Sequence, residues 1–200
     1  MISGIFGLPG AGKTTVLAML ANRALQGKSL NIGLLWRTSL QHHKTYSKVY
    51  TNFPMHGCYR LNFDDLGKFQ FENCLILIDE VMLLCDSRNW KSFSDDLKFF
   101  FSHHRKFGVD IVYCSQSYTD CDLKIRNLTE QLFHMERYGQ WTVVTPIYKT
   151  FDVYGGKINE TYEKSAPVCR SFVYRPKYYK LFDTSFSSRG QLPTKHYSMW

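Results

Sequence analysis

Residues 7–14 read Gly-Leu-Pro-Gly-Ala-Gly-Lys-Thr, which is the most informative pattern in the chain. It matches the pattern G-x-x-x-x-G-K-[ST] at every fixed position, which is typical of a loop that binds phosphate groups. The pattern is informative only where a strand precedes it and a helix follows it. Residues 2–6 form a short apolar run, and residues 14–26 have a helical pattern that stops at Gly27. We therefore predict a phosphate-binding loop between a buried strand and a helix.

Each residue type in this loop has a physical reason. Glycines permit backbone conformations that aim successive N–H groups inward, and the start of the following helix adds the positive end of its dipole. Lys13 brings a mobile charge to the β- and γ-phosphates, and the Thr14 hydroxyl completes the shell of a Mg²⁺ ion. We expect nucleotide binding by nine residues: Gly7, Leu8, Pro9, Gly10, Ala11, Gly12, Lys13, Thr14 and Thr15.

An acidic pair follows the next clear strand. Residues 74–78 are five consecutive apolar residues, as in a strand buried on both faces, and Asp79 and Glu80 come directly after them. Asp79 is placed to hold Mg²⁺ with Thr14, and Glu80 is placed to orient and deprotonate an attacking water. An acidic pair at a strand end is also an ordinary loop feature. Beside a phosphate loop the functional interpretation is favoured, because the two halves complete one site for ATP and Mg²⁺.

Glu80 also narrows the class of protein. A carboxylate directly after the Mg²⁺ aspartate is typical of ATPases that perform mechanical work. It argues against small-molecule kinases and signalling GTPases, and the guanine-reading pattern N-K-x-D is missing from the chain. Phosphate transfer to a small molecule stays a competing hypothesis.

Three further residues are candidates for catalysis. The predicted strand at 110–114 leads to Gln116, which would sit between the acidic pair and the γ-phosphate, or would only cap the strand as part of a polar turn. Arg105 closes the preceding helix, where a cation suits the helix dipole. Alternatively, Arg105 or Arg126 reaches the nucleotide of a neighbouring subunit, where an arginine can raise the rate by about 10³–10⁵. The sequence leaves both alternatives open.

The remaining pattern predicts a single α/β domain. Strands alternate with helices, so we expect a mostly parallel sheet with helices on both faces. The further elements that we expect are strands at 31–36, 48–51, 128–137 and 141–153 and a helix at 95–106.

Several segments, in this order along the chain, resemble a known family. Residues 49–54 read Val-Tyr-Thr-Asn-Phe-Pro, residues 103–111 contain His-His-Arg and lead to Ser-Gln, and residues 178–185 read Tyr-Tyr-Lys-Leu-Phe-Asp-Thr-Ser. With the phosphate loop and the acidic pair, they resemble the N-terminal ATPase domain of zonular occludens toxin-like proteins, the filamentous-phage assembly ATPases. This family is related to the FtsK–HerA group of DNA-pumping ATPases.

The resemblance implies a fold and a division of the chain. The fold is a P-loop NTPase of the RecA and FtsK–HerA type, with a mostly parallel central sheet flanked by helices and a β-rich C-terminal extension. We expect the ATPase domain to span residues 1–186 and a flexible tail to span 187–200. By position, the family's nucleotide site falls on Gly7, Gly12, Lys13, Thr14, Asp79 and Glu80, its sensor on Gln116, and its arginines on Arg105 and Arg126.

The resemblance also implies a function. We expect an ATP-hydrolysing motor for phage or virus assembly that drives DNA extrusion or genome packaging as a homo-oligomeric ring, commonly a hexamer, with DNA and virion or assembly proteins as partners. The alternative is a nucleotide-gated assembly factor with little turnover. The expected location is the host cytoplasm, at the cytoplasmic face of the inner membrane during assembly. No apolar run approaches 18 residues, so we expect membrane attachment only through a partner or a segment outside this chain.

The charge distribution is consistent with a polyanionic partner. The chain holds 25 Lys and Arg against 17 Asp and Glu, a net charge of +8, and nine of these cations against four acids lie in residues 138–200. Residues 170–180 interleave cations with aromatic residues, a pattern that binds unpaired bases and phosphates. The same pattern fits a twisted strand pair with one packed face and its cations outside.

Overall fold

The computed structural model describes residues 1–30, 44–69, 71–83, 95–119, 121, 123–154, 157–164 and 169–182, with the backbone alone described at 149, 151–154 and 157–164. The predicted strand at 31–36 and the predicted tail at 187–200 lie outside the described residues.

The architecture is a mixed sheet whose central part is parallel. Six parallel strands lie in the order β3-β2-β4-β5-β1-β6, and the antiparallel strands β7 and β8 extend the sheet beyond β6, while β9 pairs with β7. The central strands β1, β4 and β5 are buried along their whole length, as their apolar runs predict. The strand bounds are β1 Ile2–Phe6, β2 Lys48–Thr51, β3 Tyr59–Arg60, β4 Cys74–Ile78, β5 Asp110–Ser115, β6 Gln131–Tyr138, β7 Trp141–Tyr154, β8 Lys157–Lys164 and β9 Ser171–Tyr174.

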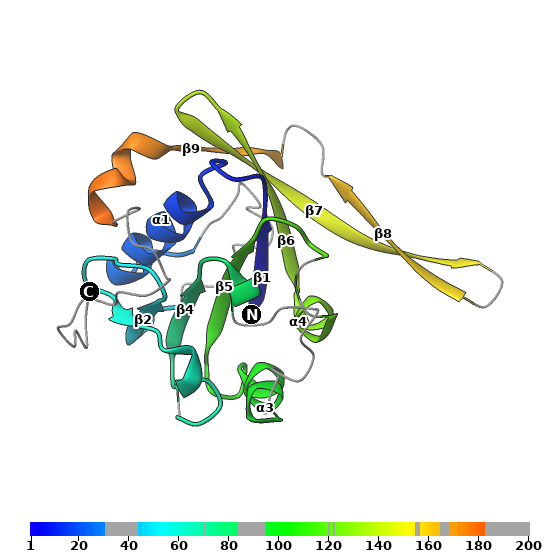
Figure 1. The fold of residues 1–200 in the computed structure, drawn as a ribbon, viewed down its shortest axis with the longest axis horizontal. Helices are drawn as coiled ribbons and strands as arrows, with labels where there is room; N and C mark the ends of the chain where they lie inside the picture. The colour runs from blue at the N-terminus through cyan, green and yellow to red at the C-terminus, as the bar shows by residue number, and fades with distance from the viewer. Residues whose placement is uncertain are drawn as a thin grey trace.

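Helices cover both faces of the sheet (Figure 1). Helix α1, Lys13–Leu25, packs on one face, where Leu17 and Leu20 share a fully buried cluster with Leu75 of β4. Helix α3, Asp95–His103, and helix α4, Leu123–Leu128, lie on the other face. The prediction of a mostly parallel α/β sheet with helices on both faces is confirmed.

The C-terminal part is rich in β-structure, as expected. The hairpin of β7 and β8 projects away from the central sheet, whereas β9 and the 3-10 helix Arg175–Leu181 return over α1 (Figure 1). In the described part of the chain, no helix is long and apolar enough to cross a membrane.

Two predicted boundaries were wrong. The predicted strand 128–137 begins later, at Gln131, because Leu128 ends α4; the buried Ile125 anchors this helix, and the Thr129 hydroxyl donates to the Ile125 carbonyl. Helix α3 ends at His103 and not at 106, because tight turns follow it up to Gly108, which has a φ of +67°.

The interpretation of residues 170–180 as a strand pair with outward cations was wrong in part. Only Ser171–Tyr174 is a strand, and a 3-10 helix follows it. Arg175 points inward and is 8% exposed. Its contacts, described below, explain why this cation is buried.

Candidate functional site

The phosphate loop connects β1 to α1 at the carboxyl edge of the sheet, where parallel strands of such folds place their ligands. Gly12 caps the N-terminus of α1 with a φ of +93°, and no side chain caps the helix there. A Cβ at Gly12 would collide with Thr142 and with the Arg175 side chain. Glycine is therefore required at this position for both its conformation and its lack of a side chain, and the amides of the first turn stay open to an anion.

Lys13 lies inside the loop with its ammonium group held by the loop itself. Its Nζ donates to the Gly7 carbonyl at 2.8 Å and to the Leu8 carbonyl at 3.3 Å, and the residue is 7% exposed. These carbonyl oxygens accept the hydrogen bonds that the Lys13 ammonium would donate to phosphate oxygens when a nucleotide is bound. The Lys13 charge is thus already aimed into the loop.

Thr14 and Asp79 come together although 65 residues separate them along the chain. The Thr14 hydroxyl donates to Asp79 Oδ2 at 2.6 Å. Burial raises the pKa of Asp79, and the hydrogen bond from Thr14 and the charge of Lys13 partly oppose that rise. A hydroxyl and a carboxylate are hard oxygen donors of the kind that Mg²⁺ prefers, so the residues present fit the ion that the sequence predicts.

Glu80 and Gln116 form the second part of the site. The Gln116 side-chain amide donates to the two carboxylate oxygens of Glu80 at 3.3 and 3.4 Å. The contact exists because β5 lies between β4 and β1, which brings the end of β5 between the acidic pair and the phosphate loop. Glu80 has a φ of +58°, a strained conformation for a residue with a side chain. Such strain clusters at functional sites, where the surrounding structure enforces it.

Asn52, to which the sequence assigns no role, contacts the backbone of the acidic pair. At the end of β2, its side-chain amide donates to the Asp79 carbonyl at 2.7 Å and accepts from the Asp79 N–H at 2.7 Å. This double contact fixes the backbone that carries Asp79 and Glu80. The family resemblance included the Val-Tyr-Thr-Asn strand and so drew attention to this segment. It did not indicate that Asn52 contacts Asp79.

The hairpin of β6 and β7 also supports the loop, and no local pattern in the sequence indicates this contact. A Cβ at Gly7 would lie 2.5 Å from the Met135 carbonyl of β6. On β7, the Thr142 hydroxyl donates to the Ala11 carbonyl at 2.8 Å. Arg175 binds the turn of the hairpin through the carbonyls of Gly139 and Gln140. The loop therefore rests on β6, β7 and a buried arginine.

The two candidate arginines lie in different places. The Arg126 guanidinium lies 5.2 Å from the ring centroid of Tyr118, which packs on Phe6 at the end of β1, and Arg126 Nε is buried with no hydrogen-bond partner among the described residues. Arg105 pairs with Glu130 at 2.7 Å at the amino edge of the sheet, across the sheet from the phosphate loop. Within one protomer Arg105 cannot reach the nucleotide site, so its predicted role requires a second subunit.

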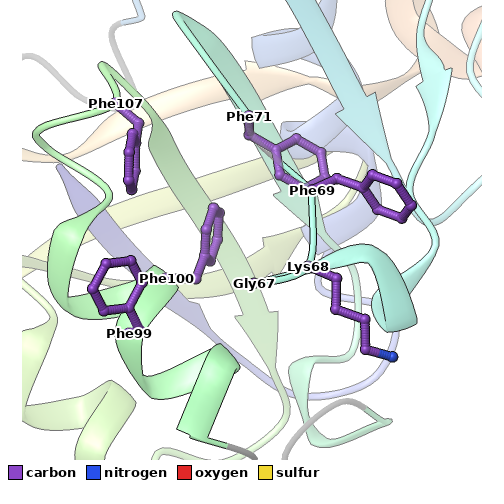
Figure 2. Close-up of a pocket in the computed structure, with 7 residues that line it drawn as sticks. All are labelled: Gly67, Lys68, Phe69, Phe71, Phe99, Phe100 and Phe107. Carbon is purple, nitrogen blue, oxygen red and sulfur yellow. The ribbon is translucent and has the colours of Figure 1, made fainter.

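An aromatic pocket of about 310 Å³ also lies at the amino edge, away from the chemistry of the phosphate loop. Figure 2 shows Phe99, Phe100 and Phe107 facing Phe69 and Phe71 across it. Phe71 precedes β4, and Phe107 precedes β5. The pocket is therefore distinct from the nucleotide site.

Comparison with known proteins agrees with this geometry. The family model described as zonular occludens toxin (Zot) matches residues 1–185. The chain belongs to the Zot family. The N-terminal domain of the zonular occludens toxin from Neisseria meningitidis has a similar fold, with a TM-score of 0.55 and 16% identity over 91% of this chain and 98% of that one.

Two weaker likenesses involve a viral protein. The genome packaging NTPase B204 from Sulfolobus turreted icosahedral virus 2, solved with ATP-gammaS, gives a TM-score of 0.45 and 8% identity over 80% of this chain and 95% of that one. A second structure of B204, the DNA-packaging ATPase from Sulfolobus turreted icosahedral virus, gives a TM-score of 0.46 and 10% identity over 80% of this chain and 95% of that one. No match to a curated protein was found. The family match and the fold shared with the Neisseria domain confirm the predicted P-loop NTPase fold for this chain.

Proposed function

We propose that this protein binds ATP with Mg²⁺ at the phosphate loop and hydrolyses it. The observation that supports this most strongly is the order of the strands. Because β5 lies between β4 and β1, Glu80 and Gln116 stand beside the loop that holds Lys13 and Thr14. A binding loop without a placed carboxylate would support nucleotide binding alone.

Each side chain has a step in this mechanism. Lys13 exchanges the carbonyls of Gly7 and Leu8 for oxygens of the β- and γ-phosphates. Thr14 and Asp79 would hold the Mg²⁺ ion, which supplies charge neutralisation at the phosphates when bound. Glu80 accepts a proton from the attacking water, and Gln116 keeps the carboxylate oriented toward that water.

We further propose that ATP hydrolysis drives DNA extrusion or genome packaging in phage assembly. Membership of the Zot family supports a role in assembly, and the net charge of +8 supports contact with a polyanion. In this proposal the protein acts as a homo-oligomeric ring with DNA and virion or assembly proteins. It works in the host cytoplasm, at the cytoplasmic face of the inner membrane.

A second candidate is a nucleotide-gated assembly factor with little turnover. Lys13 and Thr14 are placed for phosphates and Mg²⁺ whether or not turnover is fast, so the loop supports nucleotide binding on this candidate as well. The positions of Arg105 and Arg126 do not separate the two candidates, because an arginine that acts in trans lies away from the nucleotide of its own subunit. On this alternative, bound ATP would change the shape of the protein and recruit a partner.

The test is phosphate release by the purified protein without DNA, with single-stranded DNA and with duplex DNA, alongside the Glu80→Gln variant. The motor proposal expects release that rises with one form of DNA, falls with added salt and is lost in Glu80→Gln. The preferred form distinguishes extrusion of one strand from packaging of a duplex. Nucleotide binding without release under every condition would overturn the motor and favour the assembly factor.

A further inference from the structure

Strand β6 is longer than its partner β1 and continues alongside the phosphate loop. The two strands pair from Ser3 and Gln131 to Phe6 and His134, where β1 ends. β6 runs on to Tyr138 and brings the Met135 carbonyl against Gly7. The end of β6 is therefore placed beside the nucleotide site, on the flank of β1 opposite β5 and β4.

Arg137 lies on the face of β6 that carries the loop. Phe133 and Met135 of this strand belong to the core on the α1 side, so by alternation Arg137 shares their face. Its direct cross-strand partner is Thr142, the residue that donates to the Ala11 carbonyl. Arg137 Nη1 lies 4.0 Å from the position of a Cβ on Gly10, in the middle of the loop. The guanidinium is thus next to the loop backbone.

The turn between β6 and β7 holds the Arg137 side chain. Its Nε donates to the Gly139 carbonyl at 3.4 Å, within the turn that joins β6 to β7. The buried Arg175 binds the same turn through Gly139 and Gln140, while its Cδ packs against Gly12. Turn, loop and Arg137 therefore form one connected unit.

The charge of Arg137 is uncompensated. No carboxylate forms an ion pair with Arg137 in the described part of the chain, and the residue is exposed. Arg137 thus adds a second cation to the loop that already holds Lys13, and two cations on one loop favour the binding of an anion. A planar guanidinium is the side chain best suited to bind phosphate oxygens.

We propose that Arg137 binds the β-phosphate of the nucleotide within its own protomer. This inference rests on the proposed function. Asp79, Glu80 and Gln116 approach from the β4 and β5 flank and serve the metal and the γ-phosphate, so Arg137 takes the phosphate chain from the opposite flank. Because ATP and ADP both carry a β-phosphate, Arg137 contributes to the binding of both.

The test measures the dissociation constants of ATP and ADP for the full chain carrying Glu80→Gln, so that no ATP is consumed. Adding Arg137→Ala is expected to weaken the binding of both nucleotides at least about 10-fold, as for the loss of a hydrogen bond to a charged group. The nucleotide affinity of Arg137→Lys is expected to lie between that of the parent and that of Arg137→Ala. Two controls should bind as the parent does: Tyr138→Ala, the exposed neighbour on the other face, and Lys177→Ala, an exposed cation on the 3-10 helix.

A second measurement separates binding from a role in loop structure. Millimolar guanidinium ion should partly restore ATP affinity in Arg137→Ala, because it refills the missing group, and should not restore it in Thr142→Val, which loses the loop contact. Unchanged affinity in Arg137→Ala, or a loss confined to ATP, would overturn the assignment. Failure of the parent protein to bind any nucleotide would instead overturn the proposed function itself.

Discussion

The two edges of the parallel sheet treat their charged groups in opposite ways. At the amino edge, Asp110 is 6% exposed and accepts hydrogen bonds from the Met1 ammonium at 2.5 Å and from the Tyr46 hydroxyl at 2.6 Å. Lys44 adds an ion pair to the same carboxylate at 3.1 Å. Among the described residues there, Asp110 and Glu130 both lie in ion pairs with cations of the same chain.

At the carboxyl edge, the charged groups of Lys13 and Arg137 form no ion pair with a carboxylate among the described residues. Lys13 is bound only by loop carbonyls, Arg137 has no ion pair among the described residues, and Glu80 is held in a left-handed conformation. The difference supports two proposed roles: the ion pairs of the amino edge stabilise the fold, and the strained, charged groups of the carboxyl edge serve a ligand.

Glu80→Gln should lower ATP hydrolysis by about 10²–10⁴-fold, as for the loss of a general base. Nucleotide binding should be retained, since the amide replaces the carboxylate in nearly the same shape. Phosphate release and nucleotide titration measure the two properties separately. Glu72→Gln, an exposed glutamate near the amino edge, serves as the matched control. Equal loss in both variants would remove the distinction between the edges.

Asp110→Asn should lower the free energy of unfolding by about 3 kcal/mol, because it removes the buried carboxylate that pairs with two partly buried cations, the Met1 ammonium and Lys44. Burial would raise the pKa of Asp110, but hydrogen bonds from the Met1 ammonium and Tyr46 outweigh it, so the pKa lies below its ordinary value of 3.8. The stabilisation is therefore complete above that value and is lost as the pH falls through the lowered folded-state pKa.

Urea unfolding at neutral pH and at acidic pH measures both effects. Asp110→Asn should flatten the acid part of the stability profile, whereas Asp64→Asn, at an exposed position, should not. An unchanged acid profile in Asp110→Asn would show that the amino edge does not stabilise the fold through this carboxylate.

Asn52→Ala should reduce hydrolysis by about 10–100-fold, since it removes both hydrogen bonds to the Asp79 backbone. Binding of ATP should change less than turnover, because Asn52 supports the acidic pair and not the loop. Single-turnover kinetics with saturating ATP isolates this effect. Asn62→Ala is the control, because the exposed Asn62 side chain makes a single weak contact among the described residues, at 3.5 Å to Asp65.

Arg105→Ala should change the free energy of unfolding by less than about 1 kcal/mol, because Arg105 is exposed to solvent. Glu130→Gln should cost more than Arg105→Ala, because Glu130 is partly buried and also lies beside the Met1 ammonium. Thermal unfolding of both variants measures this. The amino edge of one subunit would act on the carboxyl edge of another if the difference in hydrolysis rate between the parent and Arg105→Ala grew as the protein concentration rose. That outcome would support a role for Arg105 at a neighbouring subunit's nucleotide.

Much of the site could be predicted from the sequence, because its parts are local. The phosphate loop, the strand before it and the helix after it follow from the glycine pattern and the apolar run at 2–6. The strand at 74–78 was also predicted with its observed bounds, because five apolar residues bordered by polar ones leave little choice. Boundaries failed where tight turns and short helices interrupt the pattern, as at Leu128.

A lysine, a threonine and an acidic pair stand in the sequence in a pattern that suits nucleotide phosphates, so the candidate site could be predicted before the fold was known. How these groups are held follows from the tertiary structure alone. Asn52 meets Asp79 across 27 residues, and Thr142 meets Ala11 across 131. Such contacts depend on the order of strands in the sheet, which arises from burial of all the strands together and has no local signature. The same physical cause places Arg105 at the far edge and Arg137 beside the loop.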